Sequence, residues 1–417
     1  MQPTLIWLIG ITLLLEGIGC VVFASANTES PILQLEAVLE LALKRNPAMS
    51  AAKGGVRQSQ GERIAASAFL NPSIDASAGR GSIRDPSTGV SIVERTVTVE
   101  QPLELPAKRK ARREAAEAGL SGALAGVDEA RLNVRADAKV AFYRLLLAQR
   151  DVDLSVQNLS TVREIFQTIK ARVDAGQARP FEAVKANVEL QKATKDLSRA
   201  QNALVAARAG LNAVTAGALG TDFSVDGDFA PLRHDLNPEQ LITTALESHP
   251  ILRRTAKQIE RAEHSVRLER ESRIPYVSVT GTYHREAGDE AYIAGLRMPL
   301  PLWYRRQGEI EASLGAKDRA EAERLGVQNE LIKAVTELAQ EARTDREQIE
   351  VFEKGLLKEA EEALRIARIS FRQGAAGLLE LIDSQRVYRQ MQLEYAEARA
   401  ALSISLARLE RWTGELP

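Results

Sequence analysis

The sequence predicts a mostly α-helical protein with a smaller β portion, built from two copies of one pattern. Three observations predict this class. A set of Pro, Ala and Leu positions recurs about 200 residues later, two segments of about 70 residues are free of proline and rich in helix formers, and four short runs alternate apolar and polar residues. The 417 residues are 45% hydrophobic but only 5% aromatic, so the expected core is aliphatic and rich in alanine.

Charge and cysteine content exclude several classes of protein. The 55 Lys and Arg residues balance the 56 Asp and Glu residues, so we expect no nucleic-acid partner. One cysteine cannot form an internal disulfide, and four separated histidines do not suggest a metal site, so we expect no metal and no cofactor. The motifs Gly-x-Ser-x-Gly and His-Glu-x-x-His do not occur, and neither does a phosphate-binding glycine loop, so we expect no enzymatic activity.

The N-terminus predicts export from the cytoplasm. Residues 5–15 form an apolar stretch, and the small residues Ala-Ser-Ala follow at 24–26, which indicates a signal peptide over residues 1–26. Cys20 follows Gly19, so this cysteine is either lipidated or removed with the signal peptide. We favour removal, because Gly17 stands where a lipidation site has a bulky aliphatic residue. After the signal peptide no apolar run is long enough for a transmembrane helix.

The internal duplication rests on prolines and glycines at repeated spacing. Pro47 and Pro250 each follow an Ala-Leu pair and are 203 positions apart, and Pro72 and Pro275 keep the same offset. The glycines at 176 and 374 recur 198 positions apart. We therefore predict repeat 1 over residues 27–216 and repeat 2 over residues 236–417. The Gly- and Asp-rich stretch 217–235 is the expected linker.

Each repeat is expected to contain a short helix, a proline, a second helix, a β-hairpin, a very long helix, a glycine turn and a further helix. At 1.5 Å per residue each long helix spans about 100 Å, a length typical of arms and tunnels rather than of globular cores. In the second long helix, Leu331, Val335, Ala342, Ile349 and Leu356 follow a coiled-coil spacing. The expected ranges are about 73–100, 107–175 and 180–215 for the hairpin, long helix and last helix of repeat 1, and about 276–299, 302–373 and 378–413 for those of repeat 2.

The strand-like runs have one apolar and one polar face. In 277–283, Val277, Val279 and Tyr283 alternate with Ser and Thr residues. Such hairpins occur in small soluble sheets and in transmembrane barrels. If they cross a membrane, four strands from one chain cannot close a barrel, and open edges are not tolerated in lipid, so several chains must share one barrel.

Several segments carry a resemblance to a known family. They are Asn-Pro at 46–47, His-Pro at 249–250, 100–113 (EQPLELPAKRKARR), 297–303 (RMPLPLW), 306–310 (RQGEI) and, most specific, 371–386 (FRQGAAGLLELIDSQR). These segments resemble the TolC-type outer-membrane efflux channels, the outer-membrane factor family, and the resemblance covers essentially the whole chain after the signal peptide. The stretch 104–113 is most similar to the branch that serves heavy-metal cation pumps, although that branch usually has Gly where this chain has Ala107.

The resemblance implies a homotrimer, with a 12-stranded β-barrel in the outer membrane continued by a 12-helix periplasmic α-barrel. The strand count alone predicts a shared barrel, and the value of three chains comes from the resemblance. The family's channels contact outer-membrane lipid and dock through a periplasmic adaptor protein on an inner-membrane efflux pump. The implied function is export of solutes, and of heavy-metal cations for the branch named above.

The resemblance also implies site residues near the two glycine turns. Glu380 and Asp383 share one helix face, at positions where the family's acidic residues line the closed periplasmic mouth, and Arg372 and Arg386 are candidate partners of this gate. The alternative is that these acids only solvate the start of a helix. In repeat 1, Lys185 takes the place of Asp383, so the second turn is the better gate candidate.

The same turns resemble the places where the family's adaptor docks. Arg172, Gly176, Arg372 and Gly374 are the candidate contact residues. The glycines also have the simpler interpretation of helix C-caps, and both interpretations can hold.

Two other functions remain as alternatives. One is a multidrug or other small-molecule export channel of the same family. The other is a soluble periplasmic coiled-coil adaptor, against which the two long helical copies and the lack of a β-rich domain argue.

Overall fold

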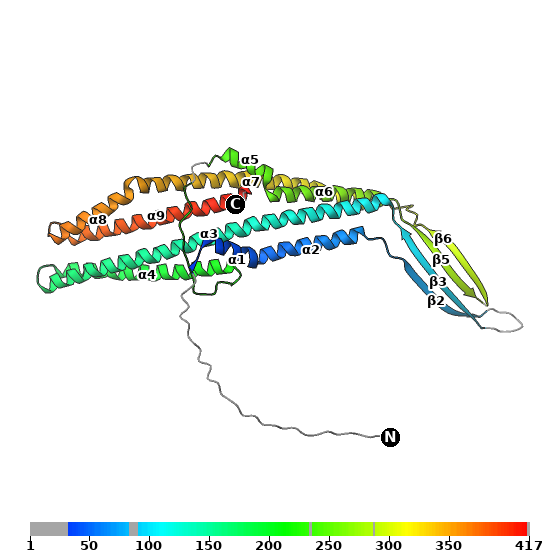
Figure 1. Cartoon of the computed structure of the whole chain (residues 1–417), viewed down its shortest axis with the longest axis horizontal. Coiled ribbons are helices and arrows are strands. Elements are labelled where there is room, and N and C mark those ends of the chain that lie inside the picture. The colour runs from blue at the N-terminus through cyan, green and yellow to red at the C-terminus, as the bar shows by residue number, and fades with distance from the viewer. Residues whose placement is uncertain (1–31, 83–90, 233–235, 287, 415–417) are drawn as a thin grey trace, which may run out of the picture.

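The computed structural model describes residues 32–82, 91–232, 236–286 and 288–414 and has a strongly elongated shape (Figure 1). A four-stranded sheet lies at one end, long helices run from it, and two helical turns lie at the opposite end. The expected signal peptide with Cys20, and the first hairpin turn near residues 85–86, lie outside the described residues.

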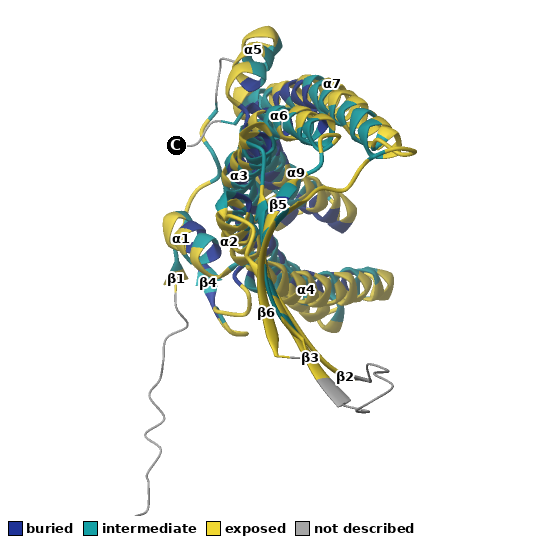
Figure 2. Ribbon diagram, turned by 90° about the vertical axis from the view of Figure 1, so that its right-hand side faces the viewer, coloured by how far each residue is buried: buried dark blue, intermediate teal, exposed yellow. Residues whose placement is uncertain are grey.

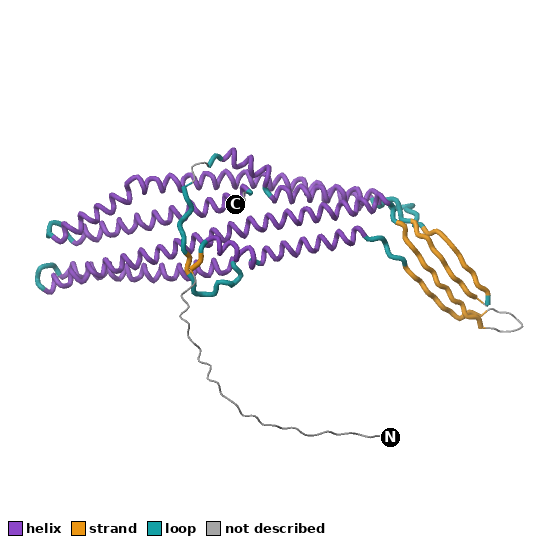
Figure 3. Tube along the Cα trace, in the orientation of Figure 1, coloured by secondary structure: helices purple, strands orange, loops and turns teal. Residues whose placement is uncertain are grey.

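The order of elements is the same in both halves of the chain, as the fold class predicted, apart from a break in the second long helix. Helices make up most of the molecule, and the larger group of strands lies at one end (Figure 3). Two short strands, β1 (Ile32–Leu33) and β4 (Ser224–Val225), pair in parallel near the middle of the molecule. The first half contains α1 (Leu35–Arg45), α2 (Pro47–Ser67), β2 (Ser73–Ser82), β3 (Ser91–Leu103), α3 (Pro106–Asp174) and α4 (Pro180–Val214). The second contains α5 (Pro238–Ser248), α6 (Pro250–Glu271), β5 (Val277–Glu286), β6 (Asp289–Arg297), α7 (Gln307–Val351), a π-helical turn (Phe352–Leu356), α8 (Leu357–Arg372) and α9 (Leu378–Thr413).

The second long helix differs from the uninterrupted helix expected over about 302–373. It begins only at Gln307, because Arg306 before it has a left-handed backbone (φ 61°). It is broken again at the π-helical turn, where Gly355 leaves the helical conformation. Leu331, Val335, Ala342 and Ile349 are fully buried as the coiled-coil spacing requires, whereas Leu356 within this turn is 38% exposed. By contrast, α3 is continuous over 69 residues, about 100 Å.

The sheet is antiparallel with strand order β2-β3-β5-β6, and cross-strand partners lie on the same face. On one face Thr98 pairs with Thr282 through their hydroxyls (3.0 Å), and Thr96 contacts Nδ1 of His284 (3.0 Å). The other face is apolar and exposed to the surroundings, as the yellow strands in Figure 2 show. Its large exposed members are Ile74, Val93, Val97, Val99, Leu103, Val279, Tyr292 and Leu296.

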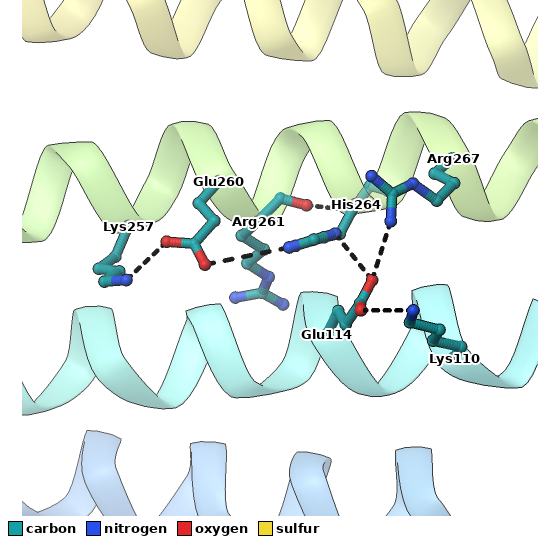
Figure 4. A network of polar contacts seen from close by, with 8 residues as sticks. Lys110, Glu114, Lys257, Glu260, Arg261, His264 and Arg267 are labelled. Atoms are coloured by element: carbon teal, nitrogen blue, oxygen red, sulfur yellow. Dashed lines mark hydrogen bonds and ion pairs between the residues drawn. The ribbon is translucent and has the colours of Figure 1, made fainter.

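Four helices continue from the sheet in the order of its strands. The helix α3 packs against α2 and α6, and α6 packs against α7, so the layer reads α2-α3-α6-α7. Charged side chains hold α3 to α6 (Figure 4): Glu114 accepts from Arg267 (3.1 Å) and lies 3.3 Å from Nδ1 of His264. In the described chain, neither α2 nor α7 has a neighbour on its outer side within this layer.

Two polar residues fasten the repeats in the same way. Asn46 accepts a hydrogen bond from Ala48 N–H (2.9 Å) and donates to the carbonyl of Val214 (2.9 Å), where α4 ends. His249 accepts from Ile251 N–H through Nδ1 (3.1 Å), so Nε2 carries the proton and donates to the carbonyl of Arg411 (3.0 Å), near the end of α9. Each residue therefore caps one helix and holds the end of another.

Burial lowers the pKa of His249 below its usual value of 6.5, despite the opposing hydrogen bond to Arg411. The neighbouring charges are Glu129, Arg411 and Arg253. Since the unfolded chain then binds a proton more readily, the contribution of His249 to stability is complete above about pH 6.5 and is lost as the pH falls through the lowered folded-state pKa.

We expect His249→Ala to lower the free energy of unfolding by about 2 kcal/mol, because a helix cap and a buried hydrogen bond are lost. His249→Asn keeps the cap and should cost about half as much. Denaturant unfolding of the purified protein in detergent at pH 7.5 and 5.5 measures both effects. The wild type should lose more stability between these pH values than His249→Asn does. Equal stability of all three proteins would contradict this role.

Candidate functional site

The candidate site is the pair of helical turns at the end far from the sheet (Figure 1). Gly176 (φ 72°) and Gly374 (φ 75°) both have the left-handed conformation that ends a helix. In the first turn, Gly176 N–H donates to Val173 O and Gln177 N–H to Arg172 O, at 2.9 and 2.7 Å. The second turn repeats this pattern, from Gly374 to Phe371 and from Ala375 to Ser370. Both glycines are thus C-caps.

The two helical hairpins share one apolar core behind these turns. Ile169 and Ala186, from α3 and α4, pack with Phe371 and Leu378, from α8 and α9. The guanidinium of Arg172 lies 4.8 Å from the ring centre of Phe371, so it reaches from the first hairpin onto the second. Arg372, in contrast, is exposed at the end of α8.

The structure brings together part of the expected gate set. Arg386 on α9 donates to Glu189 on α4 (3.1 Å) and lies 3.9 Å from Asp383. Asp383 is 73% exposed, and Glu380 on the same helix is also exposed. Among the described residues, Glu380 and Arg372 form no ion pair. Within one chain, Arg386 and Asp383 therefore contact each other, whereas Glu380 and Arg372 are exposed to solvent.

Two further residues that link α9 to the first hairpin were missed by the sequence analysis. Gln385 is buried, receives a hydrogen bond from Arg368 (2.9 Å) and donates to Asn158 on α3 (3.2 Å). Arg389 donates to Asp196 on α4 and to the hydroxyl of Ser155 on α3, both at 3.2 Å. The sequence signal for Gln385 was its spacing from Leu378 and Ile382, which places a polar residue on the buried face of α9. This signal can be recognised only after the buried positions of the helix have been assigned.

A cavity of about 280 Å³ lies beside these links, between α3, α4 and α9. Asn158, Glu189, Asp196, Gln385 and Arg386 are among its lining residues, so its wall carries charges of both signs. In the part of the chain that the structure describes, no three His, Cys, Asp or Glu side chains are grouped so that they could hold a metal ion. The site therefore consists of polar contacts between the two helical hairpins.

None of the described helices combines sufficient length with sufficient apolarity to cross a bilayer.

Known proteins match nearly the whole chain. The family described as "Outer membrane efflux protein" matches residues 38–217 and 241–415. A cobalt-zinc-cadmium resistance protein, CzcC of Cupriavidus metallidurans, is 28% identical over 365 residues, which cover 87% of this chain and 85% of the relative. A nickel-cobalt-cadmium resistance protein, NccC of Alcaligenes xylosoxydans xylosoxydans, is 27% identical and covers 75% of this chain and 70% of its own.

Solved structures share the fold at lower sequence identity. A membrane protein from Pseudomonas aeruginosa superimposes with a TM-score of 0.78 and 18% identity, covering 92% of this chain and 91% of the other. The CmeC outer membrane channel of Campylobacter jejuni has a TM-score of 0.77 and 18% identity, covering 91% and 85%.

Proposed function

Because this chain belongs to the outer membrane efflux protein family, we propose that it forms the outer-membrane channel of a three-part export system and passes heavy-metal cations. In this proposal a pump in the inner membrane and a periplasmic adaptor protein supply the cargo. The channel itself carries out no bond chemistry, and we assign it no cofactor.

The proposal of a channel rests on one observation: the sheet and the layer of helices that continues from it both have free edges. The strands β2-β3-β5-β6 and the helices α2-α3-α6-α7 follow the same lateral order, and each layer has two free edges within one chain. Because each strand is joined to one helix of the layer, a single rotation that relates neighbouring copies would close both layers. Closure removes the unpaired backbone edges that lipid does not tolerate.

We propose three copies, which give twelve strands and twelve helices around one passage. Two copies would give eight strands, which is the lower size limit of membrane barrels and leaves an interior filled by side chains. Three copies widen the barrel enough for an aqueous route. The polar face, with Thr96, Thr98, Thr282 and His284, then lines the inside.

The cargo proposal rests on the relatives, whose names specify cobalt, zinc, cadmium and nickel resistance. The tip supports passage of cations, because Glu380 and Asp383 expose carboxylates where the helices end. Repeated by threefold symmetry, these residues form acidic rings that attract cations and repel one another. We propose that Arg386, through Glu189, helps to hold this mouth closed and that Arg372 contacts a neighbouring copy.

The adaptor would dock on the two turns. Arg172, Gly176, Arg372 and Gly374 belong to these turns or to the last helical residues before them, near exposed apolar side chains of α4 and α9. Phe181 is 68% exposed and Leu379 is 57% exposed, and such side chains at a helical tip mark a protein contact.

Disruption of the gene in its own host tests the proposed cargo. We expect cobalt, zinc and cadmium to accumulate in the cells and to stop growth at lower concentrations, and a plasmid copy should restore both. Elemental analysis of washed cells measures the accumulation, and uptake of hydrophobic dyes in the same cells provides the comparison. Unchanged metal content together with increased dye content would contradict metal export and favour a channel for small organic molecules.

Single-channel recording in planar bilayers tests the proposed gate. For Glu380→Ala with Asp383→Ala, we expect block by multivalent cations to require a concentration on the order of tenfold higher, because two rings of carboxylates are lost. Arg386→Ala should raise the open fraction at rest. Arg343→Ala is the matched control, since it removes an exposed, paired cation from α7 far from the turns. Block and open fraction equal to those of the wild type would exclude a gate at these residues.

A further inference from the structure

Three arginines lie on the apolar face of the sheet, at the end where the hairpins turn. Arg95 of β3 and Arg285 of β5 are direct cross-strand partners. Arg80 of β2 lies on the same face, two residues beyond Ala78, which is the other partner of Arg95. All three side chains are exposed. Direct partners have Cβ atoms about 5 Å apart, and diagonal neighbours remain within reach of long side chains.

These arginines carry more positive charge than this face neutralises. Arg285 pairs with its partner Glu290 at 3.5 Å, and both side chains are about half exposed. Among the residues that the structure describes, neither Arg80 nor Arg95 forms an ion pair. The nearby acids Glu94 and Glu286 belong to the opposite face, where they lie beside His284. Two like charges placed directly opposite each other destabilise a sheet unless an anion lies between them.

The arginines also lie at a definite level of the membrane. The next pair toward the middle of the sheet is Tyr283 with Tyr292, whose ring centres are 5.3 Å apart. Tyr276, just before β5, and Trp303, after β6, are exposed aromatic residues at the end of the sheet where the helices begin. Tyr276 and Arg285 are nine residues apart, about 31 Å along the chain. At the tilt of about 40° that barrel strands have, this length rises about 23 Å across the membrane, close to the height of about 25 Å of the apolar band. Aromatic pairs mark the two membrane surfaces, so the arginines lie at headgroup depth.

We propose that Arg80, Arg95 and Arg285 bind the phosphate groups of the phosphorylated glycolipid (lipid A) in the outer leaflet of the outer membrane. The helices leave the opposite end of the sheet, so the arginine end faces outward; this step rests on the orientation that the proposed function requires. Guanidinium groups bind phosphate through paired hydrogen bonds and are weakly hydrated, which suits a site at the edge of the apolar band. A trimer would carry three such sites around its barrel.

Thermal unfolding of the purified oligomer in detergent, with and without added lipid A, tests the proposal. Without lipid A, Arg95→Gln with Arg285→Gln should unfold at the same or a higher temperature than the wild type, because the like-charge pair is gone. With lipid A, the wild type should gain stability and the double variant should not. Native mass spectrometry should show at least a tenfold loss of bound lipid A in the double variant.

Two controls separate charge from fold. Lys108→Gln with Lys110→Gln removes the same charge at the start of α3, beside the opposite end of the sheet. This variant should bind lipid A as the wild type does. Dephosphorylated lipid A should bind the wild type weakly. Binding of lipid A to the arginine variant at wild-type strength would overturn the proposal, and so would equal binding of the dephosphorylated form. In either case the oligomer mass and membrane insertion would still report separately on the channel.

Discussion

An unpaired strand edge cannot remain in lipid, because each free N–H and C=O group lacks the water that would otherwise bond it. One chain presents two such edges, on β2 and on β6, and the helices below repeat the same incomplete order. The rest of the molecule follows from this constraint. In the proposed assembly, neighbouring copies close the sheet and bring the edges of α2 and α7 together, so that the helical turns of all copies meet at one distant mouth.

Duplication explains how a single chain supplies two equivalent arms. Asn46 and His249 hold corresponding helix ends with different side chains, and Gly176 and Gly374 end corresponding long helices. The repeats differ in their long helices. The first long helix is continuous, whereas the second is interrupted at the π-helical turn that precedes α8. Departures of this kind are often found at functional hinges.

Much of this fold could be predicted from the sequence, because its signals are local. Prolines begin α2, α3, α4, α5 and α6, the glycines at 176 and 374 follow the ends of α3 and α8, and alternation of apolar and polar residues identifies the strands of the sheet. The kink at Gly355 was not predicted, since an isolated glycine in a helical pattern is usually tolerated. At the site, Gly176 and Gly374 were found from their spacing, but the links of Gln385 and Arg389 to α3 and α4 depend on contacts between segments about 200 residues apart, which periodicity alone does not reveal.

Cysteine cross-linking of the two sheet edges is the direct test of the shared barrel. In a Cys20→Ser background, Ile74→Cys on β2 would be combined in turn with cysteine at Tyr292, Ala294 or Leu296 on β6. If copies close the sheet edge to edge, oxidation of intact membranes should give a covalent trimer for at least one pair, while each single-cysteine chain stays monomeric on denaturing gels. Oxidation that leaves every pair monomeric, or that stops at dimers, would contradict the shared barrel.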